Sequence, residues 1–196
     1  MAQTNKSITI IVVLLFIIVL VGFIFLYNKY QTSQQAVQDQ GTNVQEKGRI
    51  VLAITDAAPS LQNITSVFID IDKAEVHNST QGWVLTSNAH RRFDLLDLKK
   101  SSTVSLLSNT QVPADTYDQV RLTVSKVLVV QNGVETEAKL PSGELKIPLN
   151  IQVNANKTTS VVLDFIADKS LHVTGKGRII FTPVIKVERS ENADVQ

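Results

Sequence analysis

The sequence contains no cysteine among its 196 residues. No disulfide can form, so the folded part of the chain must be stabilised by its own hydrophobic core. Zinc sites built on thiolates are excluded for the same reason, and so is lipid attachment at a cysteine. Nearly 150 residues follow the first 47, which is enough chain to bury a core.

Charge is absent from residues 8–27, which read ITIIVVLLFIIVLVGFIFLY. As a helix, these twenty residues would reach about 30 Å, the thickness of the hydrocarbon core of a bilayer. The alternative is a cleaved secretory signal, whose apolar region runs about 7 to 15 residues and ends at a small-x-small site. The following residues, NKYQTSQQAVQDQ, contain no Ala-x-Ala. We therefore predict an uncleaved anchor that contacts the lipid bilayer.

The basic residues beside this segment, Lys6 and Lys29, are nearly balanced and do not fix its orientation. A leading tail of only residues 1–7 favours a cytoplasmic N-terminus and an extracytoplasmic domain at the cell membrane. Residues 28–47 are polar and rich in glutamine, so we expect a flexible stalk. The folded domain is predicted at residues 48–189, and residues 190–196 are predicted to be a disordered tail.

Alternating apolar and polar residues begin at Gly48 and are typical of half-buried strands. In SVFIDID, the apolar residues Val67, Ile69 and Ile71 alternate with polar positions. Asn132 and Gly133 separate two extended runs, which indicates a hairpin. Short helical turns are expected only around residues 95–109, and Pro183 indicates an edge or a bulge in the last strand. The pattern predicts an all-β, antiparallel two-sheet sandwich of about seven to nine strands.

Several segments of the domain resemble one known family in order and spacing. These are ITDAAPSLQNITSVFIDIDKAEVH, GW, FDLLDL, VPADTYDQVRLTVSKVLVV, LPSGELKIPL and LDFIADKSLHVTGKGRIIFTPVIKV. They are similar to the family known as domain of unknown function 4382, over about residues 48–187. The resemblance implies a β-rich extracytoplasmic module, often tethered through a lipoprotein. A membrane helix in place of a lipidated cysteine is the departure here, and the family transfers no site residue.

Asp164, Asp168 and His172 are spaced four residues apart, which on a helix would align them as a site. The β-branched residues before Asp164 predict a strand instead, on which such residues lie about 13 Å apart. We expect a turn at residues 167–170 and a structural role for all three side chains.

Asp70 and Asp72 share one strand face and are the weak candidates for a metal site, although a solvated face explains the same alternation. His77 and His90 are expected to be isolated surface residues. Trp83 is expected in the core, because large aromatic side chains dominate core burial, with an exposed platform as the alternative. No cofactor is predicted.

Asn63, Asn78 and Asn156 begin N-x-S/T triplets and are candidate glycosylation sites in predicted loops. Chance alone would produce roughly two such triplets in a sequence of this composition.

The domain is neutral from Gly48 onward, with sixteen Lys and Arg against sixteen Asp and Glu, which argues against nucleic-acid binding. Neither G-x-S-x-G nor a glycine-rich phosphate loop occurs, so we expect no enzyme. The sequence predicts a tethered binding or structural module whose partner is an envelope protein or a polysaccharide. The alternatives are an accessory subunit of a membrane complex and an envelope hydrolase.

Overall fold

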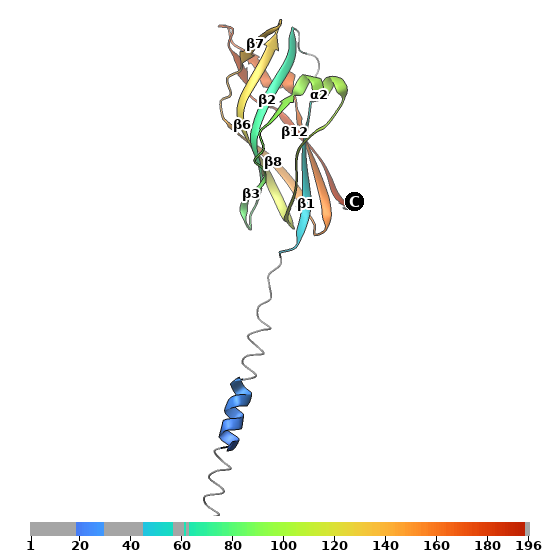
Figure 1. Cartoon of the computed structure of the whole chain (residues 1–196). Helices are drawn as coiled ribbons and strands as arrows, with labels where there is room; N and C mark the ends of the chain where they lie inside the picture. Colours follow the sequence, from blue (N-terminus) through green and yellow to red (C-terminus); the bar gives the residue numbers. More distant parts are fainter. Residues whose placement is uncertain (1–18, 30–44, 57–60, 62, 195–196) are drawn as a thin grey trace, which may run out of the picture. The chain divides into compact units, whose positions relative to one another are not determined.

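The computed structural model describes residues 19–29, 45–56, 61 and 63–194. The chain divides into two compact units, residues 1–44 and residues 45–196. In the first unit, residues 19–29 form a helix (Figure 1, blue). Within the described ranges, no helix has the length and apolar character needed to cross a membrane. The predicted anchor at residues 8–27 lies partly outside the described residues, as does most of the predicted stalk.

The second unit is a β-domain whose described residues form twelve strands in three sheets. The first sheet has the order β12 (Ile185–Asp194), β9 (Lys157–Phe165), β1 (Lys47–Thr55) and β5 (Ser105–Pro113). The second has the order β3 (Gly82–Ser87), β2 (Ile64–Asn78), β6 (Asp115–Gln131) and β7 (Val134–Glu137), with β4 (Arg91–Asp94) paired to β2 and β8 (Glu144–Val153) paired to β6. A separate hairpin joins β10 (Leu171–Val173) to β11 (Ile179–Phe181). Two short helices are α2 (Leu95–Ser101) and α3 (Ala167–Ser170).

The predicted all-β, sandwich-like architecture is confirmed, but two details are wrong. The strands outnumber the seven to nine expected, because β3, β4 and β7 are short strands of four to six residues that lie beside the long strands β2 and β6. The sheets are also not wholly antiparallel, since β1 pairs with β9 in parallel. Strand β12 continues to Asp194 alongside β9, so residues 190–194 extend the sheet where a disordered tail was predicted.

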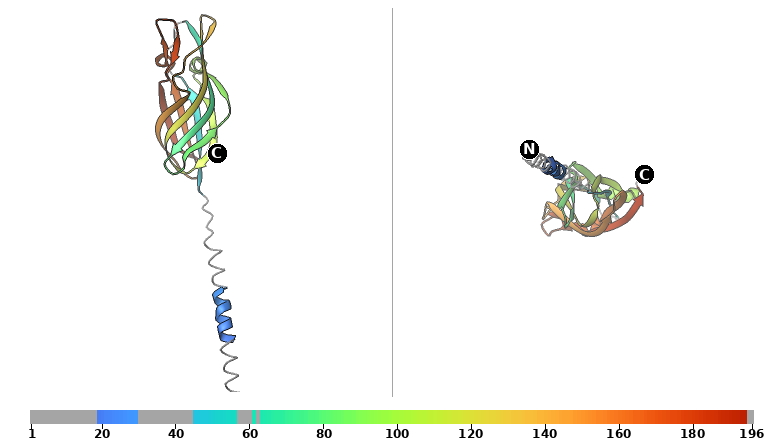
Figure 2. Two further views of the ribbon diagram at one scale, coloured as in Figure 1. Left: turned by 90° about the vertical axis from the view of Figure 1, so that its left-hand side faces the viewer. Right: turned by 90° about the horizontal axis from the view of Figure 1, so that it is seen from below.

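The core lies between the inner faces of the two large sheets, which wrap around each other in Figures 1 and 2. Val67, Ile69 and Ile71 of β2 are fully buried, as the alternation predicts. Ile50 and Leu52 of β1 belong to the same buried cluster from the opposite sheet. Burial of side chains from both layers is the main force that stabilises the domain.

The turns follow local sequence rules. Asn132 and Gly133 both have positive φ and connect β6 to β7 as a two-residue loop, so the predicted hairpin is confirmed. The side chain of Asp94 accepts a hydrogen bond from the backbone N–H of Leu96 and caps α2. Pro183 lies between β11 and β12 and separates them, where one strand with an edge or a bulge was expected.

Tyr117 ties the start of β6 to the preceding turn. Its side chain is fully buried, and its hydroxyl donates a 2.9 Å hydrogen bond to the carbonyl of Pro113. Burial of the ring raises the pKa of the Tyr117 hydroxyl above its ordinary value. Similar tyrosine contacts fix corners in other β-sandwiches.

Gly48 is required by close packing. A Cβ atom at this position would lie 2.6 Å from Cγ1 of Val153 and would also meet the carbonyl oxygen of Asn154. We predict that Gly48→Ala lowers the free energy of unfolding by about 1–3 kcal/mol, the usual cost of overpacking. Urea unfolding of the full chain in detergent measures this.

Gly175→Ala is the matched control, because a Cβ atom there meets nothing within 4 Å. Its effect should stay within about 0.5 kcal/mol. Equal stabilities of the two variants would contradict the close approach at Gly48.

Candidate binding face

The outer face of the second sheet carries a row of polar side chains along β2. Asp70 is 4% exposed and receives two hydrogen bonds from Arg92 on β4, at 2.7 Å from Nε and 2.8 Å from Nη2. The Arg92 guanidinium also lies over the ring of Phe68, 5.6 Å from its centroid. The hydrogen bonds from Arg92 hold the pKa of Asp70 below its usual value, and Asp70 in turn raises the pKa of Arg92.

Asp72 lies next along the same face and binds different partners. Its Oδ1 is 2.7 Å from Nδ1 of His90 and accepts a 3.0 Å hydrogen bond from the hydroxyl of Ser125. The hydrogen bonds from His90 and Ser125 lower the pKa of the Asp72 carboxyl. His90 is therefore exposed, as predicted, but it is not isolated.

Glu75 is the centre of a second cluster on this face. It is 6% exposed and forms ion pairs of 2.8 Å with Lys73 and 2.7 Å with Arg121 of β6. Burial by itself would raise the pKa of Glu75, but the hydrogen bonds from Lys73 and Arg121 outweigh it, so the pKa is lowered.

Trp83 belongs to this polar face and is absent from the core cluster, so its predicted core position is wrong. The guanidinium of Arg121 lies 4.1 Å from the centroid of its ring, a cation–π contact. His77 packs beside it with 5.0 Å between ring centroids, and Nδ1 of His77 is 2.7 Å from Oδ1 of Asp118. Trp83 is half-buried because these polar neighbours cover it.

The face is a network of paired charges. Arg92 binds Asp70, and His90 lies between the two carboxylates, 2.7 Å from Asp72 and 3.9 Å from Asp70. The predicted solvated surface is wrong for Asp70, which is buried under Arg92. No group of three metal-ligating side chains occurs among the residues that the structure describes. The arrangement stabilises the pairing of β2 with β4 and β6, and it leaves Trp83 and Arg121 partly accessible to a partner.

The structure separates Asp164, Asp168 and His172 as the sequence predicts. Asp164 is buried on β9, Asp168 lies in the single turn α3, and His172 is exposed on β10. Asp164 instead lines a cavity of about 460 Å³ together with Asp56 and Glu188.

The three acceptor asparagines lie in different environments. Asn63 and Asn156 are exposed in turns with φ of 61° and 59°, a conformation that asparagine tolerates well. Asn78 is fully buried at the end of β2, and its Oδ1 accepts hydrogen bonds from the N–H groups of Thr80 and Gln81. The expectation of a loop position is therefore wrong for Asn78.

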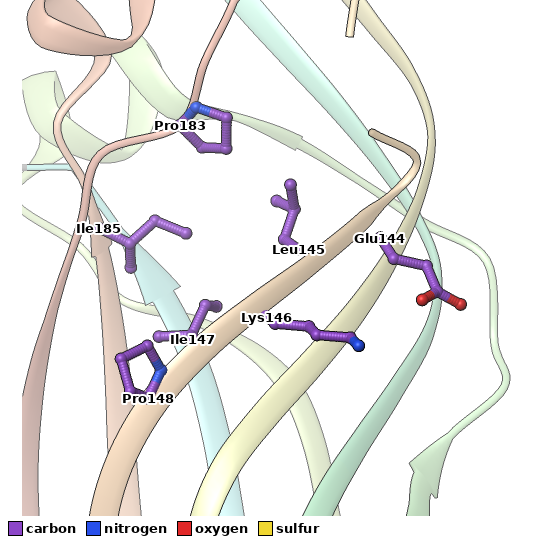
Figure 3. Close-up of a pocket in the computed structure, with 7 residues that line it drawn as sticks. All are labelled: Glu144, Leu145, Lys146, Ile147, Pro148, Pro183 and Ile185. Carbon is purple, nitrogen blue, oxygen red and sulfur yellow. The ribbon is translucent and has the colours of Figure 1, made fainter. Parts of the chain in front are cut away.

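A cleft of mixed polar and apolar lining opens where β8 and β12 lie near each other at the edges of the two sheets. Its volume is about 310 Å³. In Figure 3, Leu145, Ile147 and Ile185 surround the opening below Pro183, and Glu144 points away from it.

The outer edge of β8 is protected against an added strand. The N–H of Val124 donates to the carbonyl of Gly143, so the backbone groups of Gly143 face β6. In an antiparallel ladder, every second residue has its N–H and C=O on the opposite side, so those groups of Glu144, Lys146 and Pro148 face away from β6. The hydroxyl of Ser142 donates a hydrogen bond to the carbonyl of Glu144 and accepts one from its N–H. Pro148 has no N–H to offer. Such edges resist strand addition.

The fold and the polar sheet face define a β-sandwich-like domain. The chain belongs to the family described as Domain of unknown function (DUF4382), which matches residues 47–183. This confirms the family resemblance of the sequence.

A search of the curated proteins gives no match. Among solved structures, the chain is similar to a "putative cell adhesion protein" from Bacteroides ovatus, with 12% identity and a TM-score of 0.28. The likeness covers 77% of this chain and 46% of that one. A TM-score of this size carries no argument about fold or function.

The lowered pKa values of Asp70 and Glu75 predict a loss of stability in acid. Each carboxylate contributes stability that is present above its ordinary pKa, 3.8 for Asp70 and 4.5 for Glu75, and that is lost as the pH falls through the lower folded value. The free energy of unfolding should therefore fall as the pH drops below 4.5. Urea unfolding between pH 6 and about 3 measures this.

The double variant Asp70→Asn, Glu75→Gln should be less stable at pH 7 and should show a flatter dependence on pH. Each lost charged hydrogen bond is worth about 1.5–3 kcal/mol. Glu144→Gln, at an exposed position on β8, is the control and should keep the wild-type profile. An unchanged pH profile of the double variant would refute the role of the two carboxylates.

Proposed function

We propose that this chain is a membrane-tethered binding module, displayed outside the cell and without catalytic activity of its own. The proposal of a membrane tether rests on the exposed apolar surface of the helix at residues 19–29. Val19, Phe23 and Phe25 are 68%, 71% and 70% exposed, and the neighbouring apolar residues of this helix are at least 49% exposed. A helix that is apolar on every side requires an apolar environment.

The uncharged run at residues 8–27 continues this apolar surface toward the N-terminus in the sequence. Placed in a bilayer, it would remove from water the side chains that the helix exposes. The proposed orientation keeps the short residues 1–7 in the cytoplasm and the β-domain outside. Asn63 and Asn156 are the acceptor positions that glycosylation would use there, because both are exposed.

The proposed binding role is supported by the surfaces of the domain. The polar sheet face with Trp83, the cleft beside Ile185 and the hairpin ends of the domain are accessible surfaces of distinct chemistry. The protected edge of β8 makes loops and faces better contact sites than that strand edge. The proposed partner is an envelope protein or an envelope polymer.

The tether is tested by alkaline extraction of membranes from cells that express the full chain. We expect the wild type to stay with the membrane and the double variant Ile17→Arg, Leu20→Arg to be released. Each arginine near the middle of a membrane helix costs about 2.5–3.5 kcal/mol of insertion free energy. Gln35→Arg, Gln38→Arg adds the same charge in the polar segment and should remain bound.

Proteolysis of intact cells tests the orientation in the same strain. The segment after Lys47 should be released without permeabilisation. Protection of that segment in intact cells, or wild-type protein that washes off in carbonate, would overturn the proposal. Membrane retention of the arginine variant through a co-purifying partner would favour the accessory-subunit alternative.

A further inference from the structure

The β10–β11 hairpin lies at one end of the domain. The chain enters the domain at Lys47 and runs along β1 to Thr55, and β9 runs parallel to β1 from Lys157 to Phe165. The hairpin follows β9, so it lies at the end opposite Lys47. In the left view of Figure 2, the orange-red β10–β11 hairpin lies at that end.

Basic side chains predominate in the hairpin region. Residues 169–181 include Lys169, Lys176, Arg178 and His172 and contain no Asp or Glu, and Asp168 of α3 directly precedes them. Lys139 joins them from a distant part of the chain, because it forms a parallel bridge with Ile180. The folded chain therefore adds a cation that the local sequence lacks.

Register places several of these side chains on one face. Ile180 pairs with His172 on β10 and bridges Lys139 on its other side. Residues that pair directly across strands point to the same face of a sheet. Arg178 is two residues from Ile180, so it shares that face with His172 and Lys139.

The tip of the hairpin presents backbone donors as well. Gly177 donates to the carbonyl of Thr174, and Arg178 donates to the hydroxyl of Thr174 at 3.1 Å. Within the described part of the chain, the N–H groups of Gly175 and Lys176 have no such acceptor. The space around the Cα of Gly175 is open, so an oxyanion can approach this backbone.

These cations differ from those of the sheet face. Arg92, Arg121, Lys73 and Lys126 are each paired with a carboxylate. Among the described residues, the cations of the hairpin form no ion pair with a carboxylate. Their charge is consequently available to an external anion.

We infer that the β10–β11 hairpin, together with Lys139, binds a phosphate-bearing anionic polymer of the cell envelope. The row of cations matches a chain of repeated negative charges, and the donors at the tip match the several acceptor oxygens of a phosphate. The inference deepens the proposed binding function and rests on it for the location of the polymer.

Binding of long-chain inorganic polyphosphate to the full chain in neutral detergent tests this inference. We expect wild-type affinity to fall as salt rises, because salt screens exposed charges. The variant Lys176→Glu, Arg178→Glu should bind at least about ten-fold more weakly at low salt, since it reverses two of the contacting charges. A thermal melt checks that the variant remains folded.

Lys99→Glu, Lys100→Glu on α2 is the matched control, because it changes the net charge equally at another place. It should keep the affinity within about two-fold. Equal losses in the two variants, or no binding of polyphosphate by the wild type, would overturn the inference.

Two competitors distinguish the source of the anion. Polygalacturonate should compete more weakly than polyphosphate at equal charge. Phosphatidylglycerol added to the micelles should compete no better than free glycerol phosphate. Stronger competition by the lipid would indicate that the hairpin binds a lipid surface, and it would overturn the inference that the ligand is a polymer. The assay needs no membrane tether, so its failure is separate from a failure of the extraction test.

Discussion

The antiparallel pairing of β2 with β6 is the contact on which the rest of the domain depends. It runs from Ile64 opposite Gln131 to His77 opposite Gln119, and the other strands of the second sheet are added to its two sides. Because side chains alternate along a strand, this one register places Val67, Ile69 and Ile71 in the core. Beyond two register shifts, at Asp70/Ile71 and Ile71/Lys73, the pairing brings Glu75 opposite Arg121 on the outer face. A shift of one residue would exchange the two faces.

The pairing also explains how charge is distributed over the domain. Carboxylates on the outer face of β2 lie beside cations of β4 and β6, so ion pairs form there at little conformational cost. Partly buried pairs of this kind are retained because an unpaired buried charge is expensive. The β10–β11 hairpin lies outside the two large sheets, and among the described residues its cations form no ion pair with a carboxylate, so their positive charge stays exposed. The sheet face therefore contributes to stability, whereas the hairpin is suited to binding.

Local patterns predicted most of the strands, and they failed where contacts between distant parts of the chain determine which side chains are buried. Asn132 and Gly133 specify their hairpin because the turn itself requires positive φ. Asp70 looked solvent-exposed in an alternating strand, but Arg92 from β4 covers it. Trp83 was expected in the core because of its size, although Arg121 from β6 provides an alternative cover on the outer face. Neither partner is recognisable from spacing, because both contacts join strands far apart in sequence.

The sequence by itself determined the uncharged N-terminal run, the all-β class, the family and the core side of β2, because each depends on composition or on a period within one segment. The tertiary structure alone decided the parallel pairing of β1 with β9, the burial of Asn78 and the addition of Lys139 to the cationic hairpin. These features depend on which strands become neighbours. That choice is made by the burial of the whole core, and no single segment of the chain encodes it.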